Sequence, residues 1–588
     1  MVKKLDPILI EILWNRLIGI TDEVAITLLR TCFSSIIRDC HDYSIALFDD
    51  QKRFLAQFST SAPAQVGCMP ATIENFCRVF PPETLEDGDV LITNDPWKAI
   101  GHLNDITIVS PIFYWGKLVG FALCTVHHVD IGGHYATLES EEIFEEGLWI
   151  PICKIHKAGV PNEDLFNVIR HNVRVPDQVV GDIRAQLAAN HLSSKRVKEF
   201  LEEYGLENLR ELGDEIISRS EEAIRKQIRK IPDGTYTHSI DLDGWNDEQP
   251  RLSVAVHISG DRVVVDFEGT SRQVHRAINS VFNCTYAEVI FVMKSILDPF
   301  IPNNLGCLHP ITLKAPEGSL VNPKWPAPLW GRTIVIHQIP DLIYGALSKA
   351  IPDRVIAESG SAPLGSIGIT SVKPNGEHCL SLSFFFGGLG GRSTGDGICC
   401  VAFPCNVSNT PVELVESQVP ILWEKRELVC DSGGPGKFRG GCGQEFVFSV
   451  PSGNIGPMEN EPVFVSVRGG RFERPCQGIL GGKNSSFAKI FINDGQVKLT
   501  KPRFSLKPGD TLRYIVPGGG GYRDALDRDP YLVREDVRNS LVSIESAKID
   551  YGVIISREGF KVDEEATNQL RLSKKNTTKK AKRPRDLD

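Results

Sequence analysis

Apolar side chains recur every three to four residues between positions 7 and 31, which is the spacing of one buried face of an α-helix. Asp6 and Pro7 stand at the start of this pattern, and a capping aspartate followed by a first-turn proline favours a helix start there. The pattern then changes to short apolar runs. The segments DYSIALFDDQKRFLAQF and DITIVSPIFYWGKLVGFALCTVHH each predict two strands joined by a turn. We therefore expect an N-terminal helix followed by strand pairs.

Helical spacing returns in the middle of the chain, and short strands dominate after it. Two charge-rich helices are predicted between residues 177 and 230, the first ending at Gly205. Between about residues 360 and 521, short strands alternate with glycine clusters. The expected fold is a multi-domain α+β fold. Its regions are an N-terminal α+β region (1–175), a helical hairpin (176–232), a β-rich region (233–530) and a C-terminal extension (531–588).

Histidines and aspartates cluster at the ends of one predicted strand pair. His102 and Asp105 lie at the start of its first strand, and His127 lies at the end of its second strand. An antiparallel hairpin brings these ends side by side. Imidazole nitrogens and carboxylate oxygens are ligands that divalent metals accept, and Asp42, which opens a neighbouring strand, is our candidate for the remaining carboxylate. The alternative is that these polar residues only mark where strands meet solvent.

Three neighbours of these ligands are predicted to support the site or contact substrate. His128 follows His127 in a strand and should point to the opposite face. Asp130 is a candidate partner for orienting a ligating imidazole. Asp95 precedes a proline and could instead be a turn acceptor. The acidic run from Glu139 to Glu146 could supply a general base, but a solvated turn explains it better, and we assign no catalytic residue.

Composition and charge favour a protein with neither a membrane segment nor a nucleic-acid site. The 588 residues are 41% hydrophobic and 24% charged, which is ordinary for a globular chain with two or three cores. The net charge of −9 gives no reason to expect nucleic-acid binding. No apolar run reaches the ~18 to 20 residues that cross a bilayer, and early charges argue against a signal peptide. We expect a cytoplasmic protein.

The remaining distinctive features of the sequence predict structure rather than chemistry. None of the glycine clusters has the G-x-x-x-x-G-K-[ST] order of a phosphate loop, so we predict no nucleotide site on this chain. The fifteen cysteines form no Cys-x-x-Cys pair and are expected to be mostly buried, reduced thiols. The basic segment 573–588 lacks apolar periodicity and predicts a disordered tail, although a nucleic-acid-binding tail would look similar.

Taken in order, several motifs resemble the B-type subunit of the hydantoinase/5-oxoprolinase family. The motifs span roughly residues 5 to 530 and include TNDPW, GHLND, HHVDIGG, EEGLWIP, PEGSLVNPKWPAP, GGLGGRSTGDG, DSGGPGKFRGG and PGGGGYRD. The resemblance implies a divalent metal (zinc, manganese or iron) at Asp42, His102, Asp105 and His127. It also implies a separate A-type subunit with an actin-like fold that binds ATP.

The resemblance also implies an activity, with alternatives. Family members use ATP to open cyclic amides such as hydantoins or 5-oxoproline, whereas the related acetone and acetophenone carboxylases carboxylate ketones. Two departures bear on the substrate: a family histidine is missing near Gln65, and NDPWKAIGHLND is a version associated partly with the ketone carboxylases. The expected function is the metal-bearing subunit of an ATP-dependent cyclic amidase, a hydrolase. The alternatives are a ketone carboxylase subunit and a non-catalytic scaffold subunit.

Overall fold

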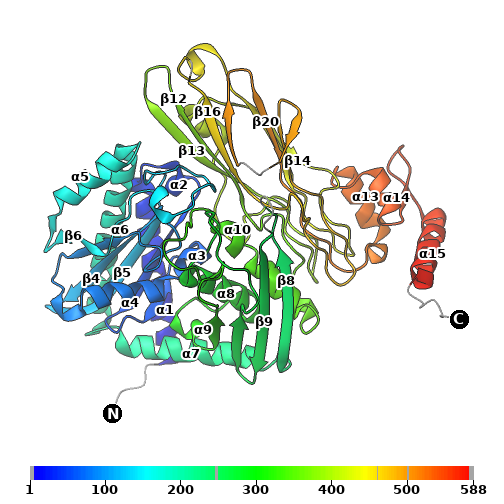
Figure 1. Ribbon diagram of the computed structural model, residues 1–588. Helices are drawn as coiled ribbons and strands as arrows, with labels where there is room; N and C mark the ends of the chain where they lie inside the picture. The colour runs from blue at the N-terminus through cyan, green and yellow to red at the C-terminus, as the bar shows by residue number, and fades with distance from the viewer. Residues whose placement is uncertain (1–5, 245–248, 460, 499–501, 582–588) are drawn as a thin grey trace.

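The computed structural model describes residues 6–244, 249–459, 461–498 and 502–581 (Figure 1). Helix α1 (Pro7–Thr31) begins where the sequence predicts, and the Asp6 carboxylate caps it by accepting a hydrogen bond from the backbone N–H of Ile8 at 3.2 Å. Its apolar stripe packs against helix α6 (Pro176–Tyr204) and one face of the first sheet. The predicted N-terminal helix is therefore confirmed.

The N-terminal sheet contains both predicted strand pairs. It has seven strands in the order β2-β1-β5-β4-β3-β6-β7. Strand β5 pairs antiparallel with both β1 and β4, so the two predicted hairpins join side by side. The strands are β1 (Tyr43–Asp49), β2 (Phe54–Gln57), β3 (Val90–Thr93), β4 (Asp105–Tyr114), β5 (Lys117–His127), β6 (Cys153–Lys157) and β7 (Val160–Pro161).

Helices cover both faces of this sheet. One face packs against α1 and α6, and the other contributes to the largest core together with shorter helices. Helix α6 ends at Gly205, whose φ of +62° is left-handed, as the sequence predicts. The helices of this half are α2 (Ser35–Arg38), α3 (Pro63–Val66), α4 (Met69–Val79), α5 (Glu163–Asn172), α6 and α7 (Arg210–Ile228).

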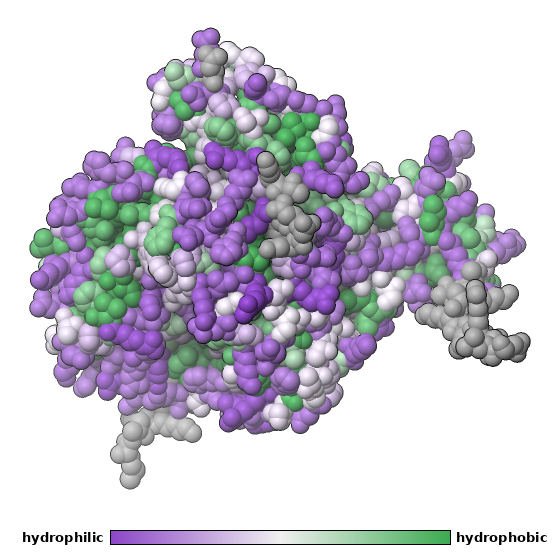
Figure 2. All heavy atoms as spheres, viewed as in Figure 1, coloured by the Kyte–Doolittle hydropathy of each residue, from purple (hydrophilic) through white to green (hydrophobic). Residues whose placement is uncertain are grey.

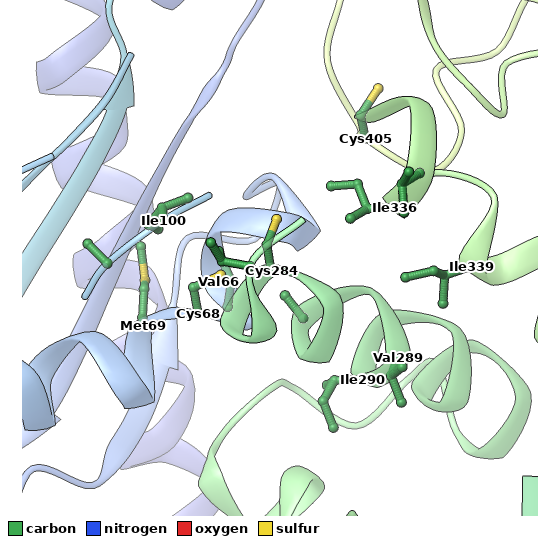
Figure 3. Close-up of a cluster of buried hydrophobic side chains, with 14 of the residues drawn as sticks. Val66, Cys68, Met69, Ile100, Cys284, Val289, Ile290, Ile336, Ile339 and Cys405 are labelled. Carbon is green, nitrogen blue, oxygen red and sulfur yellow. The ribbon is translucent and has the colours of Figure 1, made fainter. Parts of the chain in front are cut away.

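A second region adjoins the first sheet and shares its core. Its four-stranded sheet has the order β11-β10-β9-β8 and packs against α11. Figure 3 shows side chains of α3 and α8, such as Val66 and Cys284, in one buried cluster with Ile336 and Ile339. The elements are β8 (Gly234–Asp241), β9 (Arg251–Ser259), β10 (Arg262–Asp266), β11 (Ile311–Lys314), α8 (Phe282–Leu297), α9 (Leu305–Leu308), α10 (Thr333–Ile336) and α11 (Ile339–Leu347).

The part of the chain after about residue 360, where short strands alternating with glycine clusters were predicted, forms two further sheets. Their strand orders are β13-β12-β16-β19 and β14-β15-β20-β17-β18, and their inner faces share one apolar core. The elements are β12 (Gly365–Val372), β13 (His378–Phe385), α12 (Val412–Gln418), β14 (Leu422–Leu428), β15 (Gln444–Ser449), β16 (Val463–Arg468), β17 (Lys489–Ile492), β18 (Gly495–Val497), β19 (Arg503–Leu506) and β20 (Thr511–Ile515).

The glycine clusters pack backbone against backbone next to these sheets. A Cβ atom added at Gly388 would lie 1.9 Å from the carbonyl oxygen of Gly441, so a side chain there would collide with backbone. Gly519 donates its N–H to that same carbonyl oxygen at 3.0 Å. This close approach of two backbones explains why glycine occupies these positions.

The C-terminal extension is a small helical unit that projects from the β-rich region (Figure 1). Helix α15 continues to Ala581, and Lys575 in it pairs with Asp527 at 2.8 Å. The expectation of a disordered tail is therefore wrong for residues 573–581, while residues 582–588 lie outside the described part. The elements are α13 (Pro530–Arg538), α14 (Ile544–Ile549), β21 (Ile554–Ile555), β22 (Val562–Asp563) and α15 (Glu564–Ala581).

The face of the molecule shown in Figure 2 is mostly hydrophilic, with hydrophobic side chains in scattered patches. Among the described residues, no helix combines the length and the apolar character that crossing a membrane requires.

Candidate metal centre

Three of the predicted ligands converge at one point inside the molecule. Asp105 begins β4 and His127 ends β5, and the two residues are direct partners in the antiparallel ladder. His102 lies in the loop just before β4. Its Nε2 is 3.1 Å from both His127 Nδ1 and Asp105 Oδ1, and His127 Nδ1 is 3.3 Å from the same carboxylate oxygen. We call these three buried residues the metal triad.

The separations within the metal triad fit a divalent metal. Ligand distances of about 2.0 to 2.2 Å imply that neighbouring ligand atoms of a tetrahedral site lie about 3.4 Å apart, which is close to the 3.1 to 3.3 Å measured here. In addition, Asp105 Oδ1 is buried and makes no hydrogen bond among the described residues. A buried carboxylate oxygen that faces two imidazole nitrogens is a suitable cation ligand.

The fourth predicted ligand lies beside the metal triad rather than within it. The Asp42 Oδ2 atom is 3.9 Å from His127 Nδ1, and the backbone N–H of His127 donates to the Asp42 carbonyl at 3.1 Å. The other carboxylate oxygen of Asp42 accepts a hydrogen bond of 2.9 Å from Gln65 Nε2 on α3. Gln65, near which a family histidine is missing, therefore contacts a predicted ligand directly.

A buried arginine completes the surroundings of the metal triad. The Nη2 atom of Arg332 is 2.7 Å from Asp105 Oδ2, so Oδ1 of this carboxylate remains available to the two imidazoles. Burial opposes ionisation of Asp105, but His102 and Arg332 outweigh it and hold the pKa of Asp105 well below its ordinary value. Burial, with Arg332 as the next cause, lowers the pKa of His102 to about 3. His102 is therefore a neutral imidazole near pH 7, as metal binding requires.

Sequence reasoning missed Arg332, although one signal was present. It is the single charged residue in the apolar segment APLWGRTIVIHQIP, and a lone arginine in such a segment predicts burial with a partner. Its position also explains the glycine of the GHLND motif. A Cβ atom at Gly101 would lie 2.2 Å from Arg332 Nε. The Arg332 guanidinium can therefore reach Asp105 only because residue 101 has no side chain.

Comparison with known proteins agrees with the sequence motifs. The family model described as hydantoinase B/oxoprolinase matches residues 6–525. The chain belongs to this family. It is 31% identical to the B-type subunit of a putative D-/L-hydantoinase from Pseudomonas sp. (strain NS671), over 97% of this chain and 98% of the relative. The resemblance expected from the motifs is therefore confirmed.

Solved structures support the fold. The ATP-dependent caprolactamase from Pseudomonas jessenii superposes with a TM-score of 0.86 at 29% identity and covers 97% of this chain and 100% of its own. A nucleotide-free acetone carboxylase superposes with a TM-score of 0.88 over 99% of this chain and 84% of its own. At 20% identity, that second likeness shows the fold alone. The mixed α+β architecture is confirmed by both.

His128 lies on the opposite side of the sheet from the metal triad. Its Nε2 is 3.1 Å from Gln186 Oε1 on α6, and burial lowers the pKa of the imidazole. The same glutamine donates to the carbonyls of Ile106 and Cys124 on the two central strands. His128 therefore points to the opposite face from His127, as predicted, and the buried Gln186 amide of α6 bonds to the sheet.

The two other predicted neighbours have structural contacts. Asp130 accepts hydrogen bonds from the N–H of Gly132 at 3.0 Å and from Arg174 Nη1 at 2.8 Å. These contacts join two loops. None of the hydrogen bonds of Asp130 with described residues involves an imidazole, so they do not support the expectation that Asp130 orients a ligating histidine. Asp95 accepts a hydrogen bond from the N–H of Trp97 at 3.0 Å, which is the alternative predicted for it, a turn acceptor.

Glu146 differs from the solvated turn expected for the acidic run. It is only 2% exposed, and its Oε1 accepts hydrogen bonds from the backbone N–H groups of Leu329 and Trp330 at 2.6 and 2.8 Å. Burial raises the pKa of this carboxyl to about 8. The solvated interpretation is therefore wrong for Glu146, because its side chain fixes the loop that leads into Arg332.

Proposed function

We propose that this chain is the metal-bearing subunit of an ATP-dependent cyclic amidase that opens hydantoin, 5-oxoproline or lactam rings. The observation that carries the proposal is the convergence of His102, Asp105 and His127 within a chain that is similar along almost its whole length to a hydantoinase B-type subunit. The proposed partner is a separate A-type subunit that binds ATP. The name of that relative, one subunit of a larger enzyme, supports a partner, and the structural roles of the glycine clusters support an ATP site elsewhere.

The metal triad and Asp42 would hold the ion, which is zinc, manganese or iron. When bound, a divalent ion polarises a carbonyl or lowers the pKa of bound water toward ~7. Arg332 holds one oxygen of Asp105 and leaves the other facing the imidazoles. Gln65 fixes the Asp42 carboxylate in the same way from α3. Because the triad is buried, its charges act on a substrate carbonyl with little screening by water.

A ketone carboxylase is the second candidate, and one segment favours it. The sequence NDPWKAIGHLND, whose form suggests this branch, runs directly into the metal triad. Trp97 of this segment packs against Trp149, with ring centroids 6.2 Å apart, and donates its indole N–H to the Pro323 carbonyl at 3.2 Å. The intact ligand set argues against the third candidate, a scaffold without chemistry.

One experiment separates these candidates. The chain is co-purified with an A-type subunit from the same organism, and phosphate release from ATP is measured with hydantoins, lactams and ketones, with and without bicarbonate. Release that depends on a cyclic amide without bicarbonate supports the amidase, and release that requires bicarbonate and a ketone supports the carboxylase. No turnover despite stable assembly supports the scaffold. The His102→Ala complex is the control, and it should assemble without turning over substrate.

A further inference from the structure

Arg468, the last residue of β16, is a buried arginine that forms no ion pair with any described residue. The side chains of five arginines are buried in the described part of the chain. Four of them pair with carboxylates: Arg332, Arg439, Arg471 and Arg528. Arg468, at 4% exposed, makes no ion pair with a described residue, and its Nε has no hydrogen-bond acceptor there. Its guanidinium lies 5.0 Å from the ring centroid of Trp330.

The contact with Trp330 places Arg468 beside the segment that carries Arg332. Trp330, which it contacts, is two residues from Arg332, the partner of Asp105. The segment that carries Arg332 therefore has a second buried guanidinium beside it, and no carboxylate of the described residues forms an ion pair with that guanidinium.

Several other buried polar atoms also lack hydrogen-bond partners in the part of the chain that the structure describes. Among the described residues these atoms include Asp105 Oδ1, Arg332 Nε and both carboxylate oxygens of Glu288. Native interiors leave few such atoms unsatisfied, and a group of them indicates that water or a ligand is bound between them. A cation there would satisfy the oxygen atoms. A buried guanidinium that forms no ion pair with a described residue is suited to bind an anion.

We propose that Arg468 binds an oxyanion carried by the compound that occupies the metal centre, either a phosphoryl group or a carboxylate. A planar guanidinium matches two oxygens of either group, and burial without an ionic partner leaves that fork free. The cation–π contact with Trp330 holds the guanidinium over that ring. The proposal deepens the proposed function and rests on it, since a ring substrate or its ATP-activated form would bring such a group to the site.

The test measures anion binding to the metal-loaded chain in parent, Arg468→Met and Arg503→Met proteins. Arg503 is the matched control, because it lies in the same sheet, stacks on Phe464 at 4.5 Å and is exposed. Inorganic phosphate and acetate are titrated separately by calorimetry, and metal content and the thermal midpoint are recorded for each protein. We expect Arg468→Met to weaken binding roughly tenfold to hundredfold, the range of a lost charged hydrogen bond.

The thermal midpoint distinguishes a binding role from a structural one. Removing an unpaired buried charge should leave the midpoint of Arg468→Met unchanged or higher, at unchanged metal content. A lower midpoint with unchanged anion affinity would show that Arg468 is structural and would overturn the proposal. So would a parent protein that binds neither anion. Arg468-dependent binding of phosphate alone identifies a phosphoryl group, and dependent binding of acetate identifies a carboxylate.

Two further arrangements keep the test decisive. If Arg468→Met does not fold, Arg468→Lys retains the charge and loses the fork, and unchanged affinity in that variant would contradict the proposal. Anion binding is measured without turnover. A chain that fails to act on cyclic amides but binds phosphate through Arg468 therefore contradicts the proposed function and not this inference.

Discussion

Replacing Gln65 with alanine tests whether α3 supports the metal centre. The amide of Gln65 donates to Asp42 Oδ1 at 2.9 Å, and Gln65 is 2% exposed, so water cannot easily replace it. The other oxygen of this carboxylate is 3.9 Å from His127 Nδ1, which is too far for a hydrogen bond. Without Gln65, the Asp42 carboxylate is free to turn away from His127.

The size of the effect follows from this single contact. A hydrogen bond to a charged group contributes about 1.5 to 3 kcal/mol, and loss of a partner that orients a metal ligand usually lowers metal affinity by about 10- to 100-fold. The two ranges agree, because a tenfold change corresponds to about 1.4 kcal/mol. We therefore expect Gln65→Ala to bind its metal about 10- to 100-fold more weakly, with the fold retained.

The assay is competition for zinc against a chromophoric chelator, with circular dichroism as a check on folding. Gln57→Ala is the control, because Gln57 is only partly buried and its amide makes one long contact of 3.5 Å to the Phe58 carbonyl. This control should bind metal like the parent. If Gln65→Ala also binds like the parent, the reasoning that Asp42 is a ligand held in place by α3 is refuted.

Three other predictions concern ligands, pH and a buried ion pair. Alanine at either triad histidine should remove tightly bound metal in elemental analysis, whereas His128→Gln, on the other face, should retain it. Because burial raises the pKa of Glu146 to about 8, the folded chain keeps a proton that the unfolded chain releases above about pH 4.5. Stability should therefore fall between about pH 4.5 and 8, and Glu146→Gln should flatten that dependence of the urea midpoint. A slope that persists in this variant would contradict the assignment. Arg471→Met removes the ionic partner of the buried Asp341 carboxylate, which lies 2.7 Å from Arg471 Nη2. We expect this variant to lower the free energy of unfolding in urea denaturation by about 3 to 5 kcal/mol, compared with about 0.5 kcal/mol for Arg503→Met.

Local patterns in the sequence were sufficient for the elements that hold the triad. The cap at Asp6 and the apolar stripe predicted α1, and the alternating runs predicted β1, β2, β4 and β5. A hairpin also has few possible registers, so residues at its open end must meet. For this reason the sequence alone is enough to place His127 beside Asp105.

The sequence predicted less where a contact joins distant segments. Arg332 reaches Asp105 across 227 positions, and Glu146 caps the loop at Leu329 across 183. Neither contact belongs to a repeating pattern, because each depends on which surfaces of two regions pack together. The expectation for the tail fails for a related reason. Helix α15 has no clear apolar stripe, and contacts such as that of Lys575 with Asp527 dock it on another segment.

The sequence by itself determined the family, the main secondary structure and the identity of the candidate ligands, because periodicity, turn residues and hairpin pairing act over short stretches of chain. Only the tertiary structure decided which charged groups accompany those ligands. Burial changes what a side chain requires, and a carboxylate or guanidinium far along the chain becomes a partner only when packing removes both from water. Arg332 and Arg468 both illustrate this: the first has its carboxylate within the chain, and the second has none among the described residues.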